Sequence, residues 1–172
     1  ELENRYPGYY RNMATAQLAK AQTFEGENNW ERAETEYKFL IEDYSGSSEA
    51  MSTYLYLADH FEKEGRTREA AVWYRRAEEH FEETANRFAG TPREAAALSY
   101  KAELFNQKEN WSRAAEILAE LFAKFPDTPV GRRAIVSAAR LYSEKLNLPA
   151  TADSLIAVLR AHLTEVDGDP EI

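Results

Sequence analysis

The chain contains no cysteine among its 172 residues, which excludes a disulfide framework and thiol chemistry. It has only seven glycines and six prolines, too few for the many tight turns of a β-rich fold. No apolar run approaches the roughly 20 residues that a membrane-spanning helix needs. Cations are scarcer than acids, with 21 Lys and Arg against 30 Asp and Glu. The clustered basic surface that nucleic-acid binding requires is therefore not expected.

What the chain does contain is helix-forming sequence. Hydrophobic residues make up 44% and charged residues 30%, as in folded proteins, and Ala, Glu, Leu and Arg are strong helix formers. We therefore predict an all-α fold. The acidity is concentrated at residues 1–86, which hold 10 Lys and Arg against 18 Asp and Glu. This half could steer a basic partner, or it could simply be a solvated surface.

A spacing pattern recurs three times. Segments that begin at Tyr44, Phe88 and Phe125 each have a small residue 14 positions later and a second aromatic 17 positions later. These are Ala58, Ala102 and Ala139, followed by Phe61, Phe105 and Tyr142. The first aromatic ends one helix, Gly, Pro, Ser or Asp interrupts the chain, and Ser or Thr before Pro or Glu, as at Thr91 and Thr128, can cap the next helix. The small alanine allows close helix packing.

The sequence between these segments predicts a second helix in each unit. Helices that start near Trp30, Thr67 and Trp111 carry an early alanine and then apolar residues at helical spacing. Each unit is therefore expected to be two antiparallel amphipathic helices. Trp30, Trp73 and Trp111 are assigned to the core, whereas Tyr9 and Tyr10 lie near an open end.

These units resemble the tetratricopeptide repeat. The second unit matches all eight signature positions of that family, at Tyr54, Leu57, Ala58, Phe61, Gly65, Ala70, Tyr74 and Ala77. The first matches at Ala21, Phe24, Trp30, Ala33, Tyr37 and Leu40, and the third at Leu98, Ala102, Phe105, Trp111, Ala114, Leu118, Leu121 and Pro126. The fourth is degenerate, with Ala139 and Tyr142 followed by one extra residue before Ala152, Ile156 and Leu159.

The resemblance implies a right-handed superhelical solenoid of about four helical hairpins, or eight helices. The expected single domain is 1–172, with repeats at about 9–44, 48–88, 92–125 and 129–165. The chain begins within the motif, at Tyr6-Pro7-Gly8, so we expect a longer natural protein. The signature alanines Ala33, Ala70, Ala114 and Ala152 are 37, 44 and 38 residues apart, longer than the usual period of about 34.

The 44-residue spacing contains one extra heptad, 82–88. Seven residues are close to two helical turns, so this insertion should lengthen the second helix of its pair by about 10 Å. The overhang could dock a partner, or it could be covered by neighbouring helices.

Residues for catalysis or metal binding are not evident. His60 with Glu64 and His80 with Glu83 could each share a helix face, but a metal site needs three or four converging ligands. An acidic run at Glu78, Glu79, Glu82 and Glu83 is more simply an exposed, charge-paired helix face. No phosphate-binding loop or nucleophile elbow is present. We therefore expect no catalytic residue, metal or cofactor.

By the resemblance, a partner binds the concave surface lined by the first helix of each pair. The positions implied are Leu18, Gln22, Glu25, Leu55, Asp59, Glu62, Ser99, Glu103, Asn106, Val136, Arg140 and Ser143, with Arg133 nearby. The Lys and Asn clamp that some members use for a terminal carboxylate is absent. The expected function is a protein-interaction scaffold whose partner is a protein or peptide with basic and apolar side chains.

Two further expectations remain. The junctions at 88–92 and 125–129 are similar to those of bacterial cell-envelope repeat proteins, such as the periplasmic TolA-binding protein and the lipoprotein of the outer-membrane assembly machinery. A periplasmic or envelope location is therefore expected, with the cytoplasm as the alternative. The alternative function is self-association through Leu155, Leu159 and Leu163 on the last helix; an enzyme is the most distant possibility.

Overall fold

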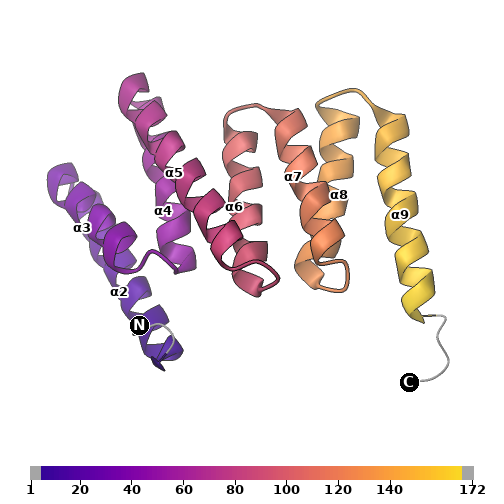
Figure 1. Cartoon of the computed structure of the whole chain (residues 1–172). Helices are drawn as coiled ribbons and strands as arrows, with labels where there is room; N and C mark the ends of the chain where they lie inside the picture. The colour runs from indigo at the N-terminus through magenta and orange to yellow at the C-terminus, as the bar shows by residue number, and fades with distance from the viewer. Residues whose placement is uncertain (1–4, 168–172) are drawn as a thin grey trace. The chain divides into compact units, whose positions relative to one another are not determined.

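The computed structural model describes residues 5–167, and the regular structure of this part is helical, without a strand (Figure 1). Its eight helices, which follow one another with short connections, are α2 (Pro7–Gly26), α3 (Trp30–Asp43), α4 (Ser48–Lys63), α5 (Thr67–Arg87), α6 (Pro92–Gln107), α7 (Trp111–Lys124), α8 (Pro129–Glu144) and α9 (Pro149–Asp167). The predicted all-α class and the number of helices are confirmed. Of the expected domain, 1–4 and 168–172 lie outside the described residues.

The chain divides into two compact units, Glu1–Ala77 and Glu78–Ile172, with the boundary inside α5. In the first unit, α2 packs against α3 and α4, and α3 also contacts α4. In the second, α6 packs on α7, α7 on α8 and α8 on α9, while α6 also contacts α8. Within each unit, therefore, the first helix of one pair contacts the first helix of the next.

The turn inside each helix pair has a recurring backbone geometry. One residue of each turn has a positive φ, between 54° and 75°, and these residues occupy corresponding positions: Asn28, Gly65, Glu109 and Asn147. In the first three turns, the backbone N–H of the next residue donates a hydrogen bond to the backbone carbonyl of an aromatic residue five positions earlier. These aromatic residues are Phe24, Phe61 and Phe105. In the fourth, Leu148 bonds to Tyr142, six residues earlier. The extra residue of the fourth unit therefore lies in its turn.

The helices that follow the inter-pair junctions are capped in two different ways. The Ser47 hydroxyl accepts from the Ala50 N–H at 3.0 Å, and Thr128 accepts from Gly131 at 3.1 Å. The expected cap at Thr91 does not form: its hydroxyl donates a hydrogen bond to the Phe88 carbonyl but accepts none from a helix N–H. The Glu94 carboxylate, in the first turn of α6, accepts the nearby Gly90 N–H at 2.5 Å. An acid in the first turn thus joins the helix to the residue before its N-cap, and its charge suits the helix N-terminus.

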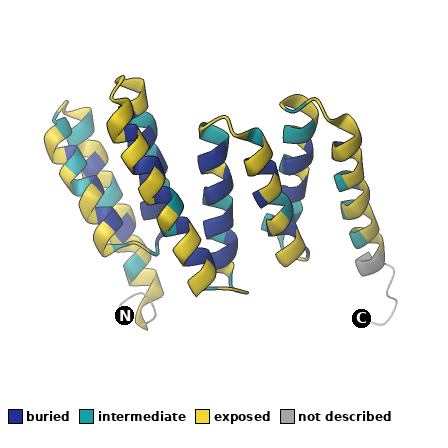
Figure 2. Ribbon diagram, turned by 45° about the horizontal axis from the view of Figure 1, so that its top comes forward, coloured by how far each residue is buried: buried dark blue, intermediate teal, exposed yellow. Residues whose placement is uncertain are grey.

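The core consists of the small and bulky residues that define the repeat. The described signature alanines are nearly inaccessible, as in Ala33 and Ala114 at 0% exposure. Phe61 and Trp73 are buried beside them, whereas Trp30 and Trp111 are half-buried. Tyr9 is 61% exposed, as expected near an open end. Figure 2 shows that buried residues follow the inner stripes of the helices and that α9 is mostly exposed.

Candidate functional site

The candidate face is the set of residues predicted to meet a partner on the first helix of each pair: α2 and α4 in the first unit, α6 and α8 in the second. In the first unit, its apolar members belong to the core. Leu18 is half-buried against the cluster of Ala14, Leu40 and Ala50, and Leu55 is only 4% exposed. Leu55 therefore presents almost no surface to a partner, while Gln22 is exposed.

The carboxylates of the face in the first unit already have partners within the chain. Glu25 accepts hydrogen bonds from the hydroxyls of Tyr37, at 2.6 Å, and Tyr56. Burial, and then the bond to Glu25, raise the pKa of both phenols above their ordinary value of 10.0. The sequence did not predict that Tyr56 takes part in this hydrogen bond. Tyr56 lies on α4, at a position where the helical pattern places polar residues.

The remaining two carboxylates on α4 are also engaged. Glu62 accepts a hydrogen bond from Tyr74 at 2.8 Å, and Asp59 pairs with Lys63, one turn later, at 2.6 Å. Burial and the bond to Glu62 raise the Tyr74 pKa. The carboxylates predicted to meet a partner in the first unit therefore form hydrogen bonds or ion pairs within the chain.

In the second unit, the structure brings four predicted residues together around one pocket of about 140 Å³. Ser99, Glu103 and Asn106 come from α6 and Arg140 from α8. Its other lining residues are Ala102, Ala114, Leu118, Ser137 and Leu141. The pocket thus has an apolar wall from α6, α7 and α8 and a polar rim from residues more than thirty positions apart in the chain.

The two charged groups of this pocket differ in how they are solvated. Burial raises the pKa of the Glu103 carboxyl, opposed by its hydrogen bond from the Asn106 amide at 3.5 Å. No hydrogen bond or ion pair to Arg140 occurs among the described residues. An arginine keeps its charge at any ordinary pH. The pocket therefore combines an unpaired guanidinium with a carboxyl that is harder to ionise than usual.

A second hollow, the C-terminal groove, adjoins the pocket along α8. It has a volume of about 570 Å³ and is lined by Pro129, Arg132, Arg133, Val136 and Ser137 of α8 and by Leu159 and Leu163 of α9. Ser137 lines both hollows. Val136 is 47% exposed and Leu163 37%. Arg133 and Val136 were predicted for the face; Arg132 and Ser137 were not, although Ser137 follows Arg133 by one helical turn.

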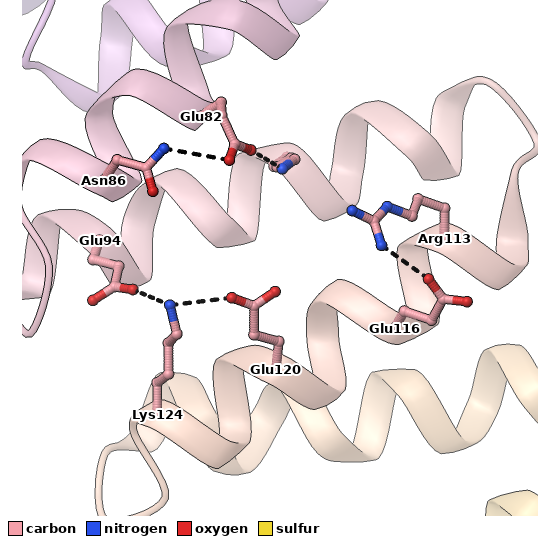
Figure 3. Close-up of polar contacts among 8 residues, drawn as sticks. Glu82, Asn86, Glu94, Arg113, Glu116, Glu120 and Lys124 are labelled. Atoms are coloured by element: carbon pink, nitrogen blue, oxygen red, sulfur yellow. Dashed lines mark hydrogen bonds and ion pairs between the residues drawn. The ribbon is translucent and has the colours of Figure 1, made fainter.

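Buried charges hold α6 in place in the second unit. Glu94 is 3% exposed and binds Lys124 of α7 at 2.5 Å (Figure 3). Burial would raise the Glu94 pKa, but Lys124 and the Gly90 N–H outweigh it, so the pKa is lowered. Lys101, 8% exposed, pairs with Glu82 of α5.

The extra heptad, 82–88, has the predicted effect on helix length. α5 has 21 residues, whereas α3 and α7 each have 14 and α9, the second helix of the last pair, has 19. Thr84 and Ala85 are buried, at 6% and 8% exposure, and Glu82 binds Lys101. These contacts favour the interpretation that the insertion is covered by neighbouring helices rather than left open for a partner.

Two of the histidines contact side chains of other segments. His60 stacks on Trp30 with ring centroids 3.5 Å apart and lies 3.4 Å from Glu64. His162, which sequence reasoning did not single out, lies 3.0 Å from the Asp127 carboxylate. Over the described part of the chain, no three His, Cys, Asp or Glu side chains gather as a metal site would require. None of the helices described combines the length and apolar character of a membrane span.

Comparison with known proteins gives one match, to a solved structure. No protein-family model matches the chain, and no curated protein is significantly similar to it. The crystal structure of BtubC (BKLC) from P. vanneervenii matches with a TM-score of 0.54 and 17% sequence identity. The match covers 93% of this chain and 67% of that one. The likeness is one of fold, between helical proteins.

Proposed function

We propose that this protein is a tetratricopeptide-like scaffold that binds a segment of another protein on the candidate face. The observation that carries the proposal is the pocket between α6 and α8. Four residues chosen from repeat position alone, Ser99, Glu103, Asn106 and Arg140, line this one hollow. A concave surface with an apolar wall and a few polar groups is the usual form of a binding site.

The repeat architecture supports the proposal in two ways. The left-handed turn residue recurs at the corresponding position of all four pairs, and the first helices of consecutive pairs touch within each unit. Both features fit the right-handed solenoid of the tetratricopeptide family, in which first helices line the inner surface. We propose this arrangement for the chain, with Gln22 as its exposed contribution from α2.

Binding, rather than catalysis, suits the chemistry of the pocket. Its titratable lining residues are Glu103 and Arg140. Ser99 donates its hydroxyl to the Ala95 carbonyl at 2.8 Å, so that hydroxyl is not directed at a base. Nucleophilic catalysis needs a base within hydrogen-bond reach of the nucleophile. We propose that the protein is not an enzyme and acts without a cofactor, in the bacterial periplasm or cell envelope.

A capture experiment tests the function. The wild-type protein and the double variant Asp59→Arg/Glu103→Arg would be used as baits in lysates of the source organism, with Glu31→Arg/Glu42→Arg, exposed on α3, as the matched control. We expect the control to recover the same partners as wild type in the same amounts, and the first variant to recover them in altered amounts, because its two new cations lie on the candidate face. Identical recovery by all three baits would contradict the assignment of the candidate face.

Self-association is a second candidate because α9 is unusually open. Val158 is 52% exposed and Leu163 37%, on the helix where Leu155 and Leu159 also lie. A second copy could cover these side chains. Light scattering across a range of concentrations tests this: a mass that rises with concentration, and that Val158→Asp/Leu163→Asp abolishes, supports self-association, whereas a constant monomer mass excludes it for this chain.

A further inference from the structure

The charges on the candidate face are unequally available to a partner. Glu25 accepts from two phenols, Glu62 accepts from Tyr74, and Asp59 is paired with Lys63. Arg133 and Arg140, in contrast, have no hydrogen bond or ion pair among the described residues. A partner that approaches this face in the second unit therefore meets positive charges that are not paired within the described part of the chain.

These arginines form part of a continuous stripe on α8. Arg133, Val136 and Arg140 are spaced three and then four residues apart, which places them on one side of the helix. Across the groove from this stripe lie Leu159 and Leu163 of α9. The sequence from Pro129 to Glu144 contains three arginines and one glutamate. This local excess of positive charge stands out in a chain of net charge −9.

The acid that lines the pocket with Arg140 does little to offset the charge of the stripe. Glu103 shares the pocket with Arg140, but burial raises its pKa, and the two are not within ion-pair distance. Arg132 uses one guanidinium N–H on the Asp127 carbonyl, at 2.8 Å, which leaves its charge unneutralised.

We infer that the C-terminal groove and the adjoining pocket bind an acidic protein segment with interspersed apolar side chains. The carboxylates pair with Arg133 and Arg140, and the apolar side chains cover Val136, Leu159 and Leu163. Charge complementarity of this kind selects the partner and speeds its association. The inference rests on the proposed function and reverses the basic partner that repeat position and overall charge alone had predicted.

The test uses fluorescence anisotropy with two labelled peptides of equal length. One alternates Asp or Glu with Leu and Phe; the other has Lys in place of every acid. We expect the whole chain to bind the acidic peptide more tightly, with an affinity that weakens as salt is added. The double variant Arg133→Glu/Arg140→Glu should weaken binding about tenfold or more, and Val136→Asp should also weaken it.

Two further variants make the result specific. Arg68→Glu, an exposed arginine on α5, is the matched control and should leave the affinity unchanged. Glu103→Gln should strengthen binding of the acidic peptide only slightly, because a carboxyl with a raised pKa opposes the arginine charge weakly. Circular dichroism would check that each variant remains helical, and Arg133→Gln with Arg140→Gln serves if charge reversal unfolds the chain.

The outcomes separate this inference from the proposed function. Tighter binding of the lysine peptide, or equal loss of binding in Arg68→Glu and Arg133→Glu/Arg140→Glu, would overturn the acidic-partner inference and leave the scaffold function standing. Absence of binding to either peptide also overturns it, while the capture experiment decides the scaffold function independently.

Discussion

The hydroxyl of Tyr74 donates a hydrogen bond at 2.8 Å to the carboxylate of Glu62, twelve residues earlier on the partner helix of the pair. Tyr37 and Glu25 repeat this arrangement at 2.6 Å in the preceding pair. In the third pair the corresponding residues are Leu118 and Asn106, so the phenol and the carboxylate are replaced together. The two residues behave as a unit that joins the helices of a pair.

Replacing Tyr74 by Phe should lower the free energy of unfolding by about 1 kcal/mol, because it removes one hydrogen bond from a buried phenol. Urea denaturation would measure it. Replacing both residues as in the third pair, Glu62→Asn with Tyr74→Leu, should cost less than the sum of the single changes. Additive effects would show that the two side chains are not coupled.

Glu94 should stabilise the protein in a pH-dependent manner. Its folded-state pKa lies below the ordinary value of 4.5, so its contribution is fully present above that value and is lost as the pH falls through the folded pKa. Glu94→Gln should lower the free energy of unfolding by about 1–2 kcal/mol at neutral pH. The difference from wild type should shrink in acid.

The matched control for Glu94 is Glu116→Gln. Glu116 pairs with Arg113 at 3.0 Å, and both side chains are about half exposed (Figure 3). Exposed pairs contribute about 0–1 kcal/mol, so urea denaturation should find little change at either pH. A Glu94→Gln cost that is no larger than that of Glu116→Gln, or that is independent of pH, would contradict the account of α6.

Lys101 and Glu82 should respond asymmetrically to substitution. Lys101 is 8% exposed and occupies the position of the buried Leu57 in the preceding pair. Lys101→Met replaces a buried cation with an apolar side chain of similar size, so stability should change little or rise. Glu82→Ala leaves the cation without its partner and should cost about 1–3 kcal/mol. Thermal unfolding that ranks the two variants in the opposite order would argue against a buried Lys101.

Gly131 should not tolerate a side chain. A Cβ at this position would overlap the carbonyl of Phe125, so Gly131→Ala should destabilise the protein by about 1–3 kcal/mol. Gly26→Ala is the matched control: its Cβ would meet nothing within 4 Å, and alanine is the better helix former, so stability should hold or rise. Equal denaturation midpoints for both variants would contradict the packing of the junction against α8.

The sequence predicts the helices well because their signal is local. The spacing of small and aromatic residues, with turn residues such as Gly65, locates all eight helices and the longer α5. Whether a predicted site residue is buried or already hydrogen-bonded depends on side chains from other helices. The spacing of residues in the sequence does not reveal these partners. Glu25 is engaged by Tyr37 and Tyr56, and Leu55 is buried.

Buried charges were harder still to foresee. Glu94 and Lys101 occupy the positions that Ala50 and Leu57 have in the preceding pair. The repeat pattern therefore assigns Glu94 to the start of a helix and Lys101 to an apolar stripe. Each charge is compensated by a residue of another helix, Lys124 or Glu82. Such pairings become visible only once the packing of α5, α6 and α7 is known.

Site-specific photocrosslinking tests most directly whether first-helix faces bind a partner. A photoreactive residue would replace Val136 of α8, 47% exposed, or Phe39 of α3, 45% exposed and on a second helix, in cells of the source organism. The account predicts crosslinks to a partner protein from position 136 and none from position 39. Equal crosslinking from both positions, or crosslinking from position 39 alone, would contradict it.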